Sequence, residues 1–354
     1  MRLSPRFAVA VLTAALLASC ASPPPEPIPV AVVPPAAPPP PPVAMPASLI
    51  ESAGAYRMYM QKASEISPAF ADGAAVEQSL TSAVAYEPKQ LLRGAIAYAA
   101  LVALQSPQFV AGVRTYAVDP AQRRDMAARL IADPNYASAL PSAASAAGLV
   151  QAALAADAAK VRKAGELVKQ AAYDVQHQSW SKADIVGRDA RLANAKTLSS
   201  QSITPPADDV QLLRTAINGR DDTGVSPLSV TGDPLAPPYT PVVLRGLTLA
   251  ALAALGEAND ANLTALEPLT QETSSAFCLN MSKLNVYQCL SVAKPYYEDV
   301  FCLGQHILLD TAQCVAKAAG QPRPIAVADA APPPPPVQSS PTAATGSAPA
   351  TAKP

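Results

Sequence analysis

Four cysteines near the end of the sequence are the residues whose types and spacing most clearly imply chemistry. Cys278 and Cys289 precede Pro295, and Cys302 and Cys314 follow it. Four thiols can form two disulfides or hold a zinc ion through thiolate ligands. Zinc sites usually contain at least one pair of ligands two to four residues apart. No such pair exists here, so the spacing favours two structural disulfides and no bound metal.

The pairing of the cysteines follows from the helices that carry them. We expect one helix before Pro295 and a second one after it, with two cysteines on each. Cysteines eleven residues apart on one helix are separated by about 16 Å, whereas a disulfide needs Cα atoms within about 7 Å. Of the three possible connectivities, only the nested pairs Cys278–Cys314 and Cys289–Cys302 are both centred on Pro295. The spacing therefore predicts an antiparallel helical hairpin closed by these two bonds.

This hairpin resembles the twin-cysteine helical hairpins of the CHCH type in its geometry. The paired cysteines of that family are closer in sequence than the ten and eleven intervening residues found here. The resemblance is limited to residues 274–320, and it implies no function.

Other groups capable of catalysis are sparse. His177 and His306 are the only histidines, and Asp310, four residues after His306, is placed to orient its ring. The turn 222–224 (Asp-Thr-Gly) resembles that of aspartic proteases, although Asp221 and Val225 depart from the pattern of that family. The sequence has neither a phosphate-binding glycine loop nor a G-x-S-x-G motif. We therefore expect a non-enzymatic protein without a cofactor.

The N-terminal residues 1–19 have the pattern of a secretory signal. Arg2 and Arg6 precede an apolar segment, Phe7–Leu17, which small residues follow. Eleven helical residues span only about 16 Å, which is too short for a hydrocarbon layer of about 30 Å. A permanent transmembrane helix is therefore not expected.

Residues 17–20 (Leu-Ala-Ser-Cys) resemble the lipobox of bacterial lipoproteins. The resemblance covers about the first 22 residues and implies cleavage before Cys20 and lipidation of that cysteine. An Asp directly after the cysteine favours the inner membrane in that family, whereas Ala21 and Ser22 stand here. The implied location is the outer membrane, with the body in the periplasm or, alternatively, at the cell surface. An ordinary cleaved signal is the competing interpretation.

Composition separates a helical body from two proline-rich ends. Residues 20–46 are expected to form an extended spacer that reaches on the order of 75 Å, and residues 321–354 a disordered tail. The chain is 50% hydrophobic and only 15% charged, with a net charge of −1. Since no basic stripe is present to neutralise phosphates, nucleic acid is not an expected partner.

Between these ends the sequence predicts an all-α, multi-helix bundle in two helical halves, 47–198 and 242–320, joined by an irregular connection, 199–241. Apolar periodicity and capping signals predict individual helices. They begin at Ser48, with Glu51 as a capping-box partner, and at Ser274 or Ser275. Asp119 and Asp133, each followed by a proline, are expected N-caps. The predicted helices cover 74–86, 91–104 after Pro88, 121–132, 142–180, 208–218 and 242–255.

The two strongly apolar helices share a local pattern. Each opens with a proline and carries arginine and glycine in its second turn, at residues 93–94 and 245–246. A duplication would place two equivalent helices at the centre of the bundle, although chance similarity between Ala/Leu-rich helices is the rival explanation.

Together these features lead us to expect a lipid-anchored protein of the cell envelope with a structural or protein-interaction role. Its expected partners are outer-membrane lipid through Cys20 and an envelope protein or peptidoglycan. The alternative is a periplasmic binding module in which helices 91–104 and 242–255 enclose a lipid or another hydrophobic ligand.

Overall fold

The computed structural model describes residues 39–220 and 223–321. The predictions for the signal sequence, Cys20, the first part of the spacer, Asp221, Asp222 and the tail beyond residue 321 lie outside these residues.

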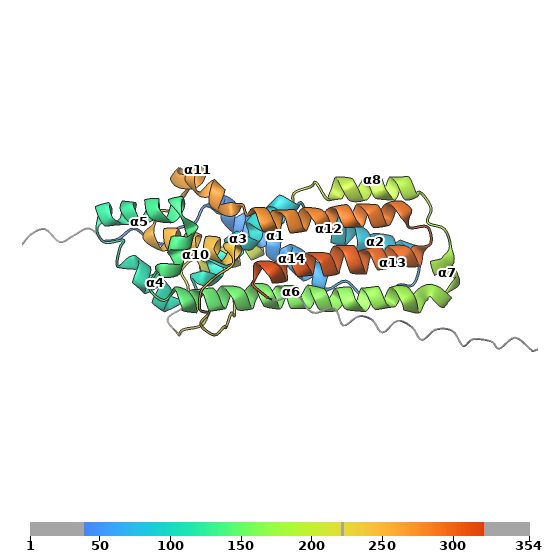
Figure 1. The fold of residues 1–354 in the computed structure, drawn as a ribbon, viewed down its shortest axis with the longest axis horizontal. Helices are drawn as coiled ribbons and strands as arrows, with labels where there is room; N and C mark the ends of the chain where they lie inside the picture. The colour runs from blue at the N-terminus through green and yellow to red at the C-terminus, as the bar shows by residue number, and fades with distance from the viewer. Residues whose placement is uncertain (1–38, 221–222, 322–354) are drawn as a thin grey trace, which may run out of the picture. The chain divides into compact units, whose positions relative to one another are not determined.

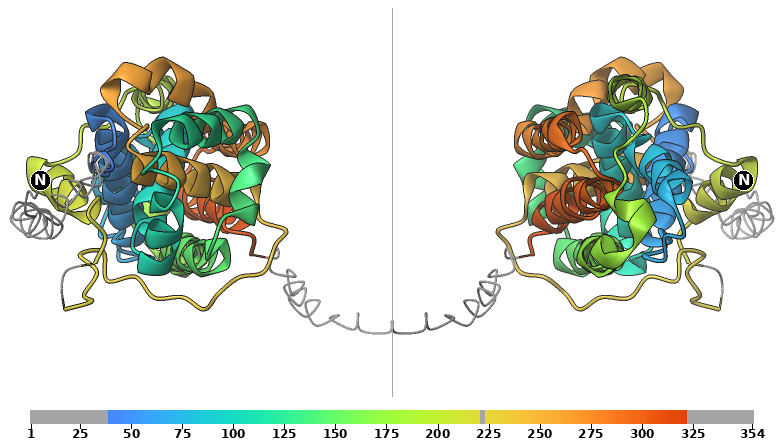
Figure 2. Two further views of the ribbon diagram at one scale, coloured as in Figure 1. Left: turned by 90° about the vertical axis from the view of Figure 1, so that its left-hand side faces the viewer. Right: turned by 90° about the vertical axis from the view of Figure 1, so that its right-hand side faces the viewer.

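The prediction of an all-α bundle is confirmed. Within the described residues the backbone forms fourteen α-helices with short 3₁₀ and π segments, and it forms no β-strand (Figures 1 and 2). The helices are α1 (Ala47–Ser64), α2 (Gly73–Val84), α3 (Pro88–Ala103), α4 (Pro107–Arg114), α5 (Pro120–Ala132), α6 (Ala143–Asp174), α7 (Ser179–Lys182), α8 (Arg188–Leu198), α9 (Ala207–Ala216), α10 (Pro241–Leu255), α11 (Leu263–Leu266), α12 (Thr273–Val292), α13 (Tyr296–Cys302) and α14 (Asp310–Ala318).

Helices α3 and α10 lie at the centre of the core, and small residues let their neighbours approach closely. A Cβ added at Gly94 of α3 would lie 2.3 Å from the carbonyl oxygen of Ser52 in α1. A Cβ added at Gly246 of α10 would lie 2.6 Å from the Cβ of Ala99 in α3. The two strongly apolar helices therefore contact each other directly at this crossing, which leaves no space there for a ligand.

Only some of the predicted N-cap residues are confirmed. Asp119 and Asp133 accept hydrogen bonds from the first backbone amides of α5 and of the following 3₁₀ turn, as predicted. The predictions of caps at Ser48 and Ser274 are wrong. Helix α1 already begins at Ala47 without a side-chain cap, and the carboxylate of Glu272 caps α12 by accepting from Ser274 N–H and Ser275 N–H.

The connection 199–241 separates the two helical parts along the chain but not in space. Its helix α9 packs against α1, and the Leu235 amide donates to the Ala144 carbonyl at the start of α6. Helix α6, which ends at Asp174 and not near Trp180, contacts helices from both parts, and all contribute to one hydrophobic core.

The end of the predicted spacer belongs to the body. Met45 is buried, and the Ala44 amide donates to the Ala253 carbonyl at 3.3 Å. The Arg114 guanidinium bridges this segment to α10 by donating to the carbonyls of Pro41 and Ala254, each at 3.1 Å. Thus residues 41–46 pack against the ends of α4 and α10.

No single helix within the described ranges is both long and apolar enough to cross a bilayer. Helices α3 and α4 meet that criterion only as a pair, and the pair bends by 86°.

The cysteine hairpin is formed by α12 and by a second arm that contains α13, the π-helix η5 (Leu303–Leu309) and α14. The predicted disulfides are confirmed: Cys278–Cys314 and Cys289–Cys302 each join Cα atoms 5.7 Å apart. The π-helix follows from the cysteine spacing. Two disulfides that lie side by side require the same length of helix between the two cysteines of each arm. The cysteines, however, are eleven positions apart in α12 and twelve in the second arm. The wider π turns accommodate the additional residue.

The π-helix packs closely on α6. A Cβ added at Gly304 would lie 2.5 Å from the backbone nitrogen of Lys169 and 2.8 Å from its Cα. A Cβ added at Gly165 of α6 would in turn lie 2.9 Å from the Leu309 side chain. The π-helix and α6 cannot move apart without disrupting the packing on their other sides, because both also contact other core helices there.

We expect Gly304→Ala to destabilise the protein by about 2 kcal/mol, because the added methyl group meets the α6 backbone and the clash outweighs the higher helix propensity of alanine. Urea unfolding monitored by circular dichroism measures this difference. Lys163→Ala on the exposed side of α6 is the control and should change stability by less than about 0.5 kcal/mol. A Gly304→Ala variant as stable as the native chain would contradict the close packing.

Candidate functional site

The two predicted disulfides hold α12 on one side of the hairpin. Because they close separations of 36 and 13 residues, the loop-entropy relation gives each a contribution of about 3–4 kcal/mol. Both bonds are structural elements that fix the rotation of α12 relative to α13 and α14.

His306 and Asp310 lie together as predicted, but in a structural contact. The Nδ1 atom of His306 is 3.2 Å from Oδ2 of Asp310, and the Asn285 amide of α12 donates to the same oxygen at 3.0 Å. Burial raises the pKa of Asp310, but the hydrogen bonds from His306 and Asn285 outweigh it and lower the pKa overall. The contact links the two arms of the hairpin. His177 lies in the 3₁₀ turn after α6 and contributes nothing to it.

Lys283 is a buried cation that the sequence reasoning missed. Its side chain on α12 is 5% exposed, and Nζ donates to the Val84 carbonyl at 2.5 Å and to the Ser199 hydroxyl at 3.2 Å. The same ammonium lies 3.3 Å from the centre of the Tyr86 ring. Burial lowers the pKa of Lys283 well below its usual value. Since Val84 ends α2 and Ser199 ends α8, the cation joins the carboxyl ends of two helices to α12, where the helix dipoles favour it.

A second buried charge fixes the other end of α12. The Arg191 guanidinium of α8 contacts Oδ2 of Asp299 at 2.5 Å and donates to the Leu290 carbonyl. Both side chains are almost fully buried. Burial raises the pKa of Asp299 to about 6, although Arg191 lowers it. The Nε of Arg191 and Oδ1 of Asp299 have no hydrogen-bond partner, so the desolvation of this pair is only partly compensated.

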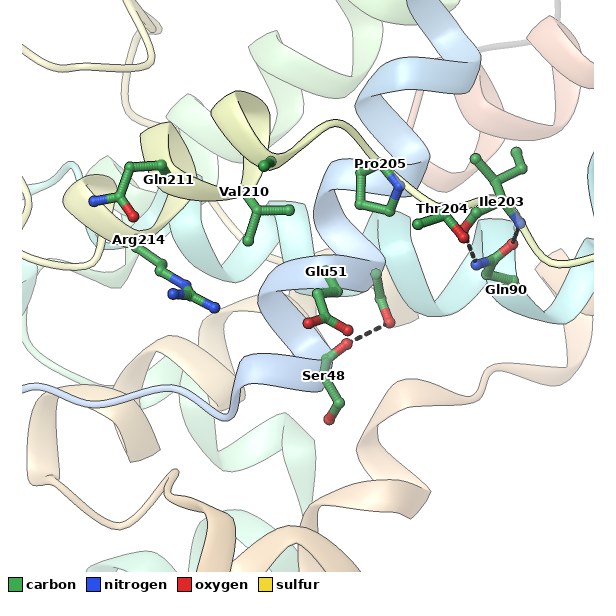
Figure 3. A pocket seen from close by; sticks show the side chains of 11 residues that line it. Ser48, Glu51, Gln90, Ile203, Thr204, Pro205, Val210, Gln211 and Arg214 are labelled. Carbon is green, nitrogen blue, oxygen red and sulfur yellow. Dashed lines mark hydrogen bonds between the residues drawn. The ribbon is translucent and has the colours of Figure 1, made fainter.

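The pocket in Figure 3 is lined by both polar and apolar residues and has a volume of about 540 Å³. Its side chains come mainly from α1, α9 and the segment before α9, and those of Glu51 and Arg214 point toward one another across it (Figure 3). Gln90 is engaged on the wall, because its amide donates to the Ile203 carbonyl and accepts from the Ile203 amide, both at 2.7 Å. Two serines of the pocket are engaged in hydrogen bonds, since the Ser52 hydroxyl donates to the Ser48 carbonyl at 2.7 Å and the Ser48 hydroxyl accepts from Arg93 at 3.5 Å.

Metal chemistry finds no support in the described ranges. No group of three or more His, Cys, Asp or Glu side chains in residues 39–220 and 223–321 is placed to hold a metal ion.

The outer side of α12 is the most unusual surface of the hairpin. In Figure 1, α12 lies between α8 and α13. Four large apolar residues are exposed on it, namely Phe277 (67%), Met281 (37%), Leu284 (50%) and Val292 (71%). The exposed residues recur at three- and four-residue steps and therefore share one side of the helix. We call this side the α12 face; it consists of Thr273, Ser274, Phe277, Asn280, Met281, Leu284, Gln288, Ser291 and Val292.

The α12 face contains no charged residue. Lys283 is the only charged residue among the twenty of the helix, and it points inward to α2 and α8. A helix exposed on the surface of a soluble bundle normally carries charged residues on its outer side. Depletion of charge combined with exposed aromatic and methionine side chains is typical of the core of a protein interface.

An apolar groove adjoins the C-terminal end of the α12 face. It has a volume of about 480 Å³ and lies between α6, α12 and α13. Its walls include Tyr173, Val292, Tyr297, Phe301 and the Cys289–Cys302 disulfide, and Glu298 is the one charged residue that lines it. Val292 belongs to both the groove and the α12 face, so the groove joins the face at this residue.

Comparisons with known proteins give no identification. No protein family, no curated protein and no solved structure matches this chain.

The buried pair predicts a specific pH dependence. Folding raises the pKa of Asp299 from 3.8 to about 6, so the folded state binds the proton more tightly than the unfolded state does. The raised pKa of Asp299 therefore adds on the order of 3 kcal/mol to the free energy of unfolding below pH 3.8. This contribution is lost as the pH rises through about 6. Relative to Asp299→Asn, the native chain should therefore lose stability between pH 4 and pH 6, as measured by urea unfolding.

Asp189→Asn is the control, since Asp189 is exposed on the same helix as Arg191. Its stability difference from the native chain should stay nearly constant over this pH range. An equally constant difference for Asp299→Asn would contradict the raised pKa.

Proposed function

We propose that this chain is a lipid-anchored protein of the cell envelope whose helical body binds another protein and catalyses no reaction. The α12 face is the observation that carries the interaction role, because it is uncharged and exposes four large apolar side chains along a helix of twenty residues. The lipobox-like residues before Cys20 support the anchor, and the proline-rich residues that follow support a spacer that holds the body away from the membrane. Acylation with more than one chain would make the attachment stable.

The residues with catalytic potential support a structural role instead. Asp310 contacts His306 and accepts a hydrogen bond from Asn285. Lys283 donates to the Val84 carbonyl at the end of α2, and Arg191 pairs with Asp299. These groups stabilise the position of α12, and none of them lines the pocket of Figure 3. A groove for a hydrophobic ligand between α3 and α10 is less favoured, since Gly246 and Ala99 bring the two helices into contact.

The outer membrane is the proposed location, with the body in the periplasm. The proposed attachment is tested by Cys20→Ala, which should shift the protein from the membrane fraction to the soluble fraction. Ala21→Asp is the matched control: it leaves Cys20 intact and places next to it the residue that favours inner-membrane retention in bacterial lipoproteins. It should keep the protein membrane-bound but move it to the inner membrane in a density gradient. A Cys20→Ala chain that sediments with the outer membrane would refute the lipid anchor.

The interaction role is tested by the reactivity of single cysteines in intact membranes. Leu284→Cys places a thiol at the middle of the α12 face, and Val186→Cys places one at a position that is 87% exposed outside this face. If a protein covers the α12 face, maleimide should label Leu284→Cys about tenfold more slowly than Val186→Cys in membranes and at a similar rate after denaturation. Equal labelling in membranes would refute the interaction role of the face.

A further inference from the structure

We propose that the partner of the α12 face is α12 of a second copy of this chain, which binds antiparallel about a two-fold axis near Leu284. The inference rests on the proposed interaction role and adds the identity of the partner. It does not depend on lipidation.

The spacing of the exposed residues is self-complementary. A point between Leu284 and Asn285, two residues past the middle of the helix, is equally far from Phe277 and Val292. Met281 and Gln288 are likewise equally far from it. An antiparallel pair centred there therefore places Phe277 of each copy against Val292 of the other. It also places Leu284 of one copy against Leu284 of the other. A surface that pairs with itself in this way forms a closed dimer.

The apolar groove gives Phe277 a place to bind. Phe277 is 67% exposed and is the largest apolar side chain on the α12 face. In the antiparallel pair it lies at the level of Val292 of the second copy, which forms one wall of the groove of about 480 Å³. The groove also offers the aromatic rings of Tyr173, Tyr297 and Phe301. Each copy thus contributes one aromatic side chain and one apolar groove, as in interfaces whose binding energy is concentrated in buried aromatic residues.

Charge also favours a second copy. In a two-fold dimer, a charged residue close to the axis lies near the same residue of the second chain. Such contacts between like charges weaken binding. The α12 face avoids this cost because none of its nine residues is charged. The antiparallel arrangement also brings opposite ends of the two helix dipoles together. An anionic lipid surface is a weaker candidate, because binding to it usually depends on Lys or Arg beside the apolar residues, and this face has neither.

Cysteine cross-linking in native membranes tests both the partner and the register. Leu284→Cys should form a disulfide-linked dimer of this chain on mild oxidation, detected by non-reducing electrophoresis and mass spectrometry. Membranes that contain both a Phe277→Cys chain and a differently tagged Val292→Cys chain should give the mixed dimer. Neither variant alone should cross-link, because the two copies of residue 277, like those of residue 292, would lie about 22 Å apart. Val186→Cys is the control outside the face.

A charge at the axis provides a second measurement. Leu284→Glu should reduce the yield of the Phe277–Val292 cross-link about tenfold or more, since it brings two carboxylates together. Expressing the Leu284→Glu chain together with a Leu284→Lys chain should restore the cross-link between them. Because residue 284 is exposed in the single chain, both variants should keep the helical circular dichroism of the native protein.

The results separate this inference from the proposed function. A slowly labelled Leu284→Cys that cross-links to itself supports both. A slowly labelled Leu284→Cys that cross-links to another protein, or to none, overturns the second copy and leaves the interaction role intact. Rapid labelling without cross-linking overturns both. Self-linking of Phe277→Cys alone would also overturn the proposed antiparallel register.

Discussion

The close approach of helix backbones at small residues is the constraint on which the rest of the structure depends. Gly94, Gly246 and Gly304 each stand where a neighbouring helix leaves no room for a methyl group. An alanine- and glycine-rich core removes little apolar surface per residue, so its stability comes from many short contacts spread over long helices. This packing fixes the centre of the bundle. Helices α8 and α12 lie outside this centre and are attached by further interactions.

Buried charges and covalent bonds supply that attachment. Lys283 draws α12 toward the carboxyl ends of α2 and α8, and Arg191 ties α8 to the Leu290 carbonyl and Asp299. The disulfides hold the flank of α12 that faces the second arm of the hairpin. With its inner side occupied by these contacts, the helix has only one side left to present outward. The exposure of Phe277 and Leu284 is therefore determined by the polar contacts on the opposite side of the same helix.

The sequence was sufficient for the features that depend on local chemistry. Helical periodicity, the caps at Asp119 and Asp133, and the nested disulfides all follow from spacing along the chain. It was insufficient where distant segments decide the outcome. Lys283 has an unremarkable sequence context, and only the position of Val84 and Ser199 shows that it is buried. The α12 face was not predicted either, although the sequence contains one signal for it. Apart from Lys283, no charged residue occurs between residues 273 and 292. The connection 199–241 was predicted to be a boundary because its prolines and glycines indicate local irregularity but not its contacts with α1 and α6.

The π-helix between Cys302 and Cys314 determines which side of the second arm faces α12. The cysteines are eleven positions apart in α12 and twelve in the second arm, and the additional residue is absorbed within Leu303–Leu309. Each residue of an α-helix turns the chain by about 100° and lengthens it by about 1.5 Å. Without the π-helix, one cysteine of this arm would be turned away from α12 once the other was bonded. The register in which α14 packs against α12 is therefore set within these seven residues.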